Sequence, residues 1–367
     1  MIHKSAKPLL IRVVLSGLFG PLGLAFIGLV FFAGHPLTQA QEVVSTQQDQ
    51  RKVPAAYETI GSLELASNDL ISRDVKIEKL GGAYQWSEGP VWIKDGGYLL
   101  FTDVPGNTIY KFAEDEGITT WMRPSGHPDP KPSYTSSQGA NGLYSLDALH
   151  IIVPDHGNRT LYKLNIKTKS KSVLVDRFEG KKFNSPNDAV LSKTGVIYFT
   201  DPPYGLVKQD NSEAKELSFN GVYALYPDGA VALLDDKLTR PNGIILSPDE
   251  RTLYVANSDP DDAKWMAYSL DENGMPNDRR EILNVTADVK AGEPGLPDGM
   301  AIDIDGNLYA TGPGGVLILS PQGERLGLIR TGTAIANCTF GDDGQTFYMT
   351  SHSFLARVKT QAKGLGF

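Results

Sequence analysis

The sequence predicts an all-β protein, a six-bladed β-propeller with a central metal site, and three observations support this. First, a motif in which a polar residue opens a short apolar strand occurs six times, at spacings of 53, 46, 55, 56 and 39 residues by subtraction of positions. About 40–50 residues suit one four-stranded blade. Second, Asp-Gly and Pro-Asp pairs between apolar runs indicate hairpins. Third, no long amphipathic helix is evident after residue 76, so we expect that part of the chain to be nearly all β. The repeat indicates one large domain rather than two.

Each of the six copies opens with an acidic or amide side chain. The opening residues are Glu88, Asn141, Asn187, Asn242, Asp298 and Asn337. A closed ring of blades brings equivalent positions of every repeat to one axis. We therefore expect the six oxygen-bearing side chains to meet at one end of a central tunnel.

The second strand of each copy returns beside the first. In the first copy, the strand 91–93 is followed by the turn Asp95-Gly96-Gly97 and the strand 98–103. Because the pairing is antiparallel, the end of the second strand lies beside the start of the first. We expect the polar residues at that return position to lie on the same face as the opening residues. They are Asp103, Asp155, Asp201 and Asn257.

Composition and charge exclude several function classes. The formal net charge is −8 and the sequence pI is about 5.3, which argues against nucleic acid as a partner because phosphate binding needs a basic face. A single cysteine, Cys338, excludes an internal disulfide and a Cys-rich zinc site.

The first 40 residues predict export. Lys4, Lys7 and Arg12 precede 22 uncharged residues, 13–34, and small residues stand at positions 38 and 40 before a cleavage site. A retained signal-anchor is the open alternative, since such a run can span a bilayer. Both readings place the remainder outside the cytoplasmic membrane, so we expect a periplasmic or secreted protein, or one anchored facing outward. We interpret residues 41–75 as a linker or lead-in and residues 76–367 as the propeller.

The opening residues have the chemistry of a hard-cation site. Glu88 and Asp298 carry negative charge, and the amides supply neutral oxygens. Calcium takes about 6–8 such oxygens, so Ca²⁺ is the expected ion, while Zn²⁺, Mn²⁺ and Mg²⁺ stay open. Trp86 and Trp92 flank Glu88, and a carboxylate buried between them needs a cation.

Several segments, taken together, are similar to the senescence marker protein/gluconolactonase family, which includes regucalcin-like proteins. They are Trp86–Trp92, Asp155–Arg159, Asn184–Asp188, Tyr198–Gly205, Arg240–Gly243 and Pro297–Met300. The resemblance covers about residues 80–360. It implies a six-bladed propeller, a divalent metal in the central tunnel, and hydrolysis of sugar lactones such as gluconolactone.

The resemblance also implies site residues. The metal ligands would be Glu88, Asn187, Asn242 and Asp298, with Asn187 acting directly, through a water, or on the substrate. In the animal branch a substrate-binding arginine stands where this sequence has Ser185. Arg159 and His156 are the nearest replacements, and the candidate substrate contacts are Asn141, Arg159 and Asn187.

The expected reaction is hydrolysis of a lactone whose carbonyl is polarised by the metal and attacked by water. Asp298 is the candidate general base, and His156 is the alternative. The sequence has no Gly-x-Ser-x-Gly elbow, which disfavours a serine-triad hydrolase. Two other functions stay open: a related propeller esterase, lactonase or organophosphatase with another substrate, and a non-catalytic binding propeller that keeps calcium for rigidity.

Overall fold

A computed structural model describes residues 56–129 and 132–367. The predicted signal segment and the first part of the predicted linker lie outside these ranges. The described residues form strands β1 to β28, one short α-helix, α1 (Thr286–Lys290), and two 3-10 helices, η1 (Lys94–Gly96) and η2 (Gln209–Asn211). None of their helices is long and apolar enough to cross a membrane. The prediction of a nearly all-β chain is confirmed.

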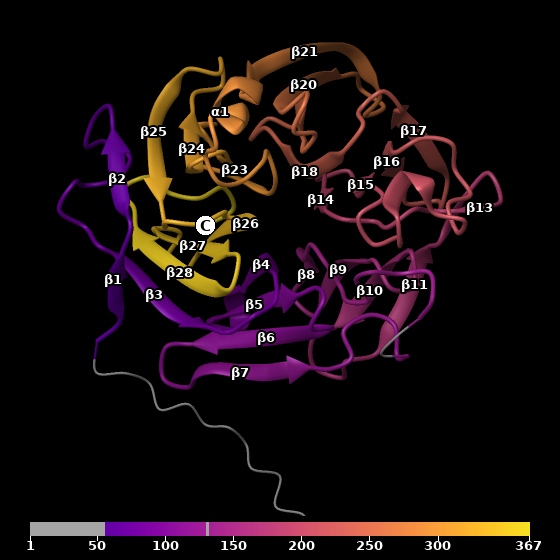
Figure 1. Cartoon of the computed structure of the whole chain (residues 1–367), viewed down its shortest axis with the longest axis horizontal. Coiled ribbons are helices and arrows are strands. Elements are labelled where there is room, and N and C mark those ends of the chain that lie inside the picture. The colour runs from indigo at the N-terminus through magenta and orange to yellow at the C-terminus, as the bar shows by residue number, and fades with distance from the viewer. Residues whose placement is uncertain (1–55, 130–131) are drawn as a thin grey trace, which may run out of the picture. The chain divides into compact units, whose positions relative to one another are not determined.

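Four four-stranded and two five-stranded antiparallel sheets build the ring (Figure 1). Blade 1 contains β4 (Ser87–Ile93), β5 (Tyr98–Asp103), β6 (Thr108–Ala113) and β7 (Gly117–Met122). Blade 2 contains β8 (Tyr144–Asp147), β9 (His150–Asp155), β10 (Thr160–Asn165) and β11 (Lys171–Val175). Blade 3 contains β14 (Ala189–Leu191), β15 (Ile197–Asp201), β16 (Gly221–Leu225) and β17 (Val231–Asp235). A small hairpin, β12 (Arg177–Phe178) and β13 (Lys181–Lys182), lies between blades 2 and 3 in sequence.

The second half of the chain repeats this plan. Blade 4 contains β18 (Pro241–Leu246), β19 (Thr252–Asn257), β20 (Lys264–Leu270) and β21 (Pro276–Asn284). Blade 5 contains β22 (Met300–Ile302), β23 (Leu308–Gly312), β24 (Gly315–Leu319) and β25 (Arg325–Arg330). Blade 6 contains β26 (Asn337–Gly341), β27 (Thr346–Ser351) and β28 (Phe354–Lys359), and takes its fourth strand from β3 (Ile77–Gly82).

The ring is closed by strands from both ends of the described chain. β3 pairs with β28, with Gly82 opposite Phe354, so blade 6 combines an early strand with the last three. Contacts between innermost strands run from β4 through β8, β14, β18, β22 and β26, and return to β4. These pairings confirm the six-bladed propeller predicted from the repeat.

The predicted linker is wrong over part of its length. β1 (Glu58–Ile60) pairs with β3, and β2 (Ser62–Leu65) pairs with β25 as an edge strand of blade 5. Gly61 joins them at a positive φ of 66°, and a Cβ there would lie 1.9 Å from the carbonyl oxygen of Arg330. Residues 58–65 are therefore an integral part of the outer edge of the propeller.

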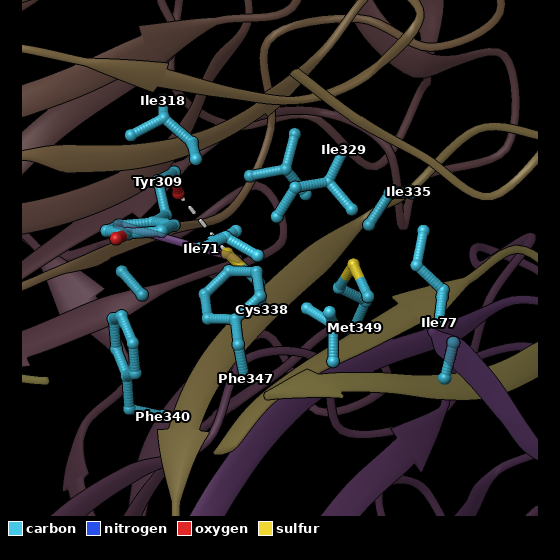
Figure 2. Close-up of a cluster of buried hydrophobic side chains, with 14 of the residues drawn as sticks. Ile71, Ile77, Tyr309, Ile318, Ile329, Ile335, Cys338, Phe340, Phe347 and Met349 are labelled. Atoms are coloured by element: carbon cyan, nitrogen blue, oxygen red, sulfur yellow. Dashed lines mark hydrogen bonds between the residues drawn. The ribbon is translucent and has the colours of Figure 1, made fainter. Parts of the chain in front are cut away.

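A large apolar cluster packs between blades 5 and 6 (Figure 2). Phe340 and Phe347 of blade 6 contact the ring of Tyr309 of blade 5, with centroids 5.0 Å apart in both pairs. Cys338 lies in this cluster, and its thiol donates to the carbonyl oxygen of Tyr309 at 3.3 Å. Burial raises the pKa of the Cys338 thiol. The single cysteine is therefore a packing residue.

Glycine follows four of the opening residues because the innermost strands approach closely at the axis. A Cβ on Gly89 would lie 2.1 Å from the carbonyl oxygen of Asn141. A Cβ on Gly243 would lie 2.1 Å from the carbonyl oxygen of Asp298. No side chain fits at these distances, so glycine at these two positions lets the start of one blade touch the opening residue of the next.

Candidate metal and active site

Five of the six opening residues line one cavity of about 600 Å³ at the axis of the ring. Glu88 lies in β4 and Asn242 in β18, and the other three stand just before their innermost strands. The five are Glu88, Asn141, Asn187, Asn242 and Asp298. The structure thus brings together all four residues that the family resemblance implies as metal ligands, and one candidate substrate contact.

The sixth opening residue, Asn337, does not line this cavity, so the expectation that all six meet at one end is wrong. Asn337 instead lines a second cavity of about 400 Å³ together with Asp188. Its side chain hydrogen-bonds the carboxyl groups of Glu88 and Asp188, and its Oδ1 accepts from the backbone N–H of Cys338 at 2.8 Å. Asn337 is thus held between two acids and turned away from the first cavity.

The pKa values of the acidic side chains in the site are raised. Glu88 is only 3% exposed; its burial, with Asp188 nearby, raises the pKa of Glu88 to about 7. Burial, then the charges of Glu88 and Asp188, raise the pKa of Asp298 well above its usual range. Without a cation these carboxyl groups repel one another and hold protons. A bound cation removes that repulsion.

Two amide side chains are oriented by neighbours in the cavity wall. The amide nitrogen of Asn141 lies 3.0 Å from Nε2 of His156, and that of Asn242 donates to the hydroxyl of Ser258 at 2.8 Å. The Oδ1 atoms of both amides are buried and have no hydrogen-bond partner. Buried oxygens of this kind need a donor or a cation.

The donor set suits a hard divalent cation. Two carboxylates and two unpartnered amide oxygens are the ligand types that Ca²⁺ takes. Among residues 56–129 and 132–367, no group of three or more His, Cys, Asp and Glu side chains is placed to hold a metal. Amide oxygens are ligands that calcium takes, whereas zinc sites are built mainly from Cys sulfur and His nitrogen. Asn187, 4% exposed in the same wall, adds a further amide.

His156, the alternative general base, lies in the cavity wall. Burial lowers the pKa of His156 to about 3, so its ring is neutral near pH 7. Nδ1 is buried without a partner, and Nε2 faces the amide of Asn141. The ring is therefore placed to orient Asn141.

Arg159, a predicted substrate contact, is not part of the cavity wall. Its Nε donates to the carbonyl oxygen of Phe183 at 2.6 Å, and Nη1 lies 3.8 Å from Oε1 of Glu216. The backbone of Arg159 has a positive φ of 61°, just before β10. The side chain therefore extends toward the segment between blades 2 and 3 rather than toward the axis.

The four return-position residues also stay out of the cavity wall. Asp103 accepts hydrogen bonds from the backbone N–H groups of Gln85 and Trp86 at 3.1 Å each. Asp201 accepts at 2.7 Å from the two equivalent N–H groups that precede Asn187. These acids lie at the expected edge of their blades, where they fix the backbone that leads to an opening residue.

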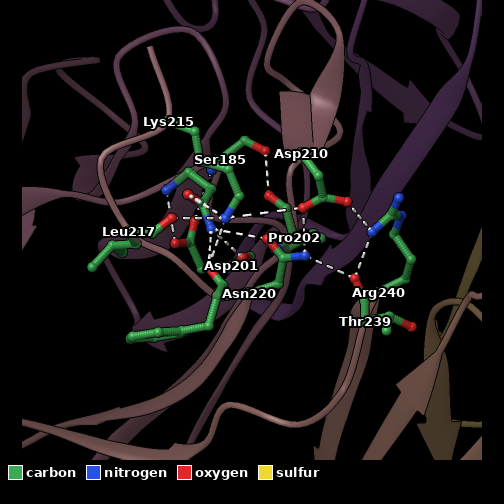
Figure 3. A network of polar contacts seen from close by, with 11 residues as sticks. Ser185, Asp201, Pro202, Asp210, Lys215, Leu217, Asn220, Thr239 and Arg240 are labelled. Atoms are coloured by element: carbon green, nitrogen blue, oxygen red, sulfur yellow. Dashed lines mark hydrogen bonds and ion pairs between the residues drawn. The ribbon is translucent and has the colours of Figure 1, made fainter. Parts of the chain in front are cut away.

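Ser185 stands where the animal branch has an arginine, and here it supports a loop. Its hydroxyl donates to the carbonyl oxygen of Pro202 at 2.5 Å and accepts from the backbone N–H of Gly205 at 2.9 Å. Figure 3 shows Ser185 and Pro202 within a polar network that includes Asp201. The loop carries Tyr204, which lines the cavity. Ser185 thus acts on the site indirectly.

Sequence reasoning did not place several of the wall residues in the cavity. Most come from loops between strands or blades, which carry no repeating pattern. They include Trp86, Val104, Tyr204, Ser258, Val289, Leu296 and Ile335. Of these, Trp86 was expected only to flank and bury Glu88. Tyr204 falls in a segment that carries the family resemblance, and that was its only signal.

Comparison with known proteins agrees with this geometry. A curated gluconolactonase of Zymomonas mobilis is 44% identical, over 83% of this chain and 88% of that protein. The solved structure of a gluconolactonase from Xanthomonas campestris has a TM-score of 0.73 at 27% identity, covering 85% of this chain and 99% of that one. A calcium-binding regucalcin from Agrobacterium tumefaciens shares the fold, with a TM-score of 0.61 at 17% identity, over 78% and 94% of the two chains.

The family model described as SMP-30/Gluconolactonase/LRE-like region matches residues 86–353. That range begins at Trp86, two residues before the first opening residue, and ends just before β28. It therefore includes all five opening residues that line the cavity. The chain belongs to the SMP-30/gluconolactonase/LRE-like family.

Proposed function

We propose that this protein is a divalent-metal-dependent hydrolase that opens lactones of the gluconolactone type. The observation that carries the proposal is the convergence of two acids, Glu88 and Asp298, with the unpartnered amide oxygens of Asn141 and Asn242 in one cavity. The identity to a curated gluconolactonase over most of both chains supports the substrate class.

Each residue of the cavity has a distinct role in this proposal. Glu88, Asn187, Asn242 and Asp298 hold the cation, with Ca²⁺ the ion that suits them best. The bound dication supplies Lewis acidity toward a lactone carbonyl and offsets the negative charge that develops there. Asn141 presents its free oxygen to the substrate side of the cavity, held by His156.

Asp298 is the proposed proton acceptor for the attacking water. It is half-buried at the cavity wall, whereas Glu88 is almost fully buried and hydrogen-bonded to the N–H of Gly89 at 3.0 Å. The greater access of Asp298 favours it for contact with water. His156 is a weaker candidate because burial depresses its pKa to about 3 and one ring nitrogen faces Asn141.

Metal removal and restoration test the proposal. The purified protein is stripped with a chelator, and gluconolactone ring opening is followed by proton release, with spontaneous opening subtracted. We expect the rate to fall to background and to return with Ca²⁺, Mn²⁺, Mg²⁺ or Zn²⁺, one of which restores it best. Full activity after verified metal removal contradicts metal dependence, and no activity with any ion contradicts the lactonase assignment. The second result favours the binding propeller.

We also propose that the protein is exported, from the basic residues and the uncharged run of its first 34 residues. The exported form should begin near Gln41. Mass spectrometry of periplasmic, medium and membrane fractions tests this. Peptides containing Lys4 in the membrane fraction would favour a retained anchor over cleavage.

A further inference from the structure

The wall of the cavity is divided into two chemically different arcs. One arc is mainly polar. Ser137 comes from the segment between blades 1 and 2, His156 from the loop between β9 and β10, and Tyr204 from the loop between β15 and β16. The remaining arc, from the segment between blades 4 and 5 round to blade 1, is mainly apolar apart from the opening residues. Its main side chains are Trp86, Val104, Val289, Leu296, Ala334 and Ile335.

The apolar arc is contiguous in the ring. Val289 lies in α1 and Leu296 in the segment between α1 and β22, so both stand between blades 4 and 5. Ile335, only 1% exposed, lies between blades 5 and 6, and Trp86 directly precedes β4, the first strand of blade 1. Innermost strands of these blades contact in the same order. The apolar side chains therefore follow one another, blade by blade, around one side of the cavity.

A fully hydroxylated sugar ring would make no matching contact with this apolar surface. A sugar lactone carries hydroxyl groups on nearly every ring carbon, and a hydroxyl placed against apolar side chains loses its hydrogen bonds to water. The cavity, at about 600 Å³, falls within the range of about 300–1000 Å³ that holds drug-sized ligands. One sugar ring is smaller than such a ligand and leaves the apolar arc uncovered.

We propose that the substrate is a lactone with an apolar substituent, alkyl or aryl, that packs on this arc while the ester group lies at Glu88 and Asp298. The inference rests on the proposed lactonase function and names its substrate class more closely. The polar arc then faces the ring oxygen and any ring hydroxyl. A sugar lactone is accepted by the same ester-binding groups but lacks the second contact.

A homologous series of lactones tests the inference with the full-length, metal-loaded protein. δ-Valerolactone, δ-hexalactone and δ-octalactone differ only in the length of an alkyl substituent, and gluconolactone is measured beside them. Burial of each additional methylene in the transition state should raise kcat/KM about fourfold. We therefore expect kcat/KM for δ-octalactone to exceed that for δ-valerolactone by between about 10-fold and 60-fold.

Two near-isosteric variants locate the effect. Leu296→Asn and Val289→Thr put polar atoms into the arc. Each should reduce the gain along the series, which is the ratio of kcat/KM for δ-octalactone to that for δ-valerolactone, to below about 5-fold. Val173→Thr is the matched control, since Val173 lies on β11 and is 64% exposed, and it should keep the full gain. Circular dichroism and thermal unfolding confirm that each variant is folded.

The outcomes separate the two claims. A flat or falling series in the wild type, with gluconolactone still hydrolysed, overturns the apolar substituent and leaves the lactonase function standing. An unchanged gain in both arc variants overturns the role of the arc. If no lactone is hydrolysed with any ion, the proposed function fails and the inference fails with it.

Discussion

The side-chain amide of Asn242 and the hydroxyl of Ser258 form a hydrogen bond whose direction is fixed. Ser258 donates its single proton to the carbonyl oxygen of Pro297, so its oxygen can only accept from Asn242. The amide nitrogen of Asn242, 2.8 Å away, must therefore face Ser258. The opposite atom, Oδ1, is left without a partner in the cavity wall. Ser258 thereby sets which end of the amide is offered to a cation.

This relationship predicts that Ser258→Ala weakens metal binding although Ser258 is no proposed ligand. Without the acceptor, the amide of Asn242 is free to rotate and to turn its nitrogen toward the cation. Mutating a residue that orients a metal ligand typically lowers metal affinity by about 10–100-fold. We expect calorimetry to show a loss of metal affinity of at least about 10-fold. Ser269→Ala, on the exposed side of β20, is the control. Equal affinity in both variants would show that Ser258 does not orient the amide.

Removing either negative charge of the site should lower metal affinity more than Ser258→Ala does. Glu88→Gln and Asp298→Asn each delete a full anion that faces the dication, while nearly keeping side-chain volume. Breaking a buried charge interaction costs about 3–5 kcal/mol, so we expect metal affinity to fall by at least about 100-fold and activity with it. Glu272→Gln, an exposed charge change, should have no effect. Unchanged metal affinity in both site variants would disprove the ligand assignment.

Metal binding should release protons near neutral pH. Burial raises the pKa of Glu88 to about 7, and the pKa of Asp298 is also raised, so the metal-free site is partly protonated at pH 6. A cation displaces those protons. Affinity should therefore rise between pH 6 and pH 8. Calorimetry in two buffers of different ionisation enthalpy measures the release, and an enthalpy independent of the buffer would contradict it.

The same groups give the metal-free protein a pH-dependent stability with a defined sign. The folded-state pKa of Glu88 lies above its ordinary value near 4.5, so the folded protein binds the proton more tightly than the unfolded chain. This contribution is fully present below about pH 4.5 and is lost as the pH rises through about 7. Thermal unfolding without metal should thus shift to lower temperature between pH 5 and pH 8. Added Ca²⁺ should reverse the shift at pH 8, and absence of any shift would argue against protonated acids at the axis.

The repeat predicted the fold and five cavity residues for one physical reason. Residues such as Glu88 and Asn242 stand at the start of innermost strands, and ring closure makes equivalent positions converge whatever the loops do. Asn337 departs because its amide is held between the carboxyl groups of Glu88 and Asp188. That contact depends on three blades at once, so no feature within its own repeat could indicate it.

The parts that could not be predicted depend on contacts distant in sequence. β2 is a four-residue strand whose partner, β25, lies more than 250 residues later, and a short, partly polar stretch has no signal of its own. The apolar arc of the cavity also had no signal in the sequence, because Leu296 and Ile335 lie in loops with no periodicity. Arg159 and His156 were expected to replace the arginine that is absent at Ser185, but only His156 lines the cavity, because the Arg159 side chain donates to the carbonyl oxygen of Phe183.

Deleting the two edge strands should destabilise the propeller. A chain that lacks residues 1–66 loses β1 and β2, and with them the backbone pairing to β3 and β25. At about 0.5–1.5 kcal/mol for each net hydrogen bond, we expect a loss of several kcal/mol and a lower unfolding temperature. A chain that lacks only residues 1–55 is the control, because it keeps both strands. Equal unfolding temperatures for the two chains would mean that the edge strands add nothing to stability.

The last prediction separates the roles of Asp298 and His156 in catalysis. If Asp298 is both ligand and proton acceptor, Asp298→Asn should lose turnover even when excess metal restores occupancy. His156→Ala should then mainly raise KM, because Asn141 loses the partner that orients it, and His156→Gln should recover part of the loss through its amide oxygen. If His156 is the base, His156→Ala should instead lower kcat by about 10²–10⁴-fold with little change in KM. Kinetics of the three variants at saturating metal decide between these patterns, and turnover near that of the wild type in all of them would show that neither residue accepts the proton.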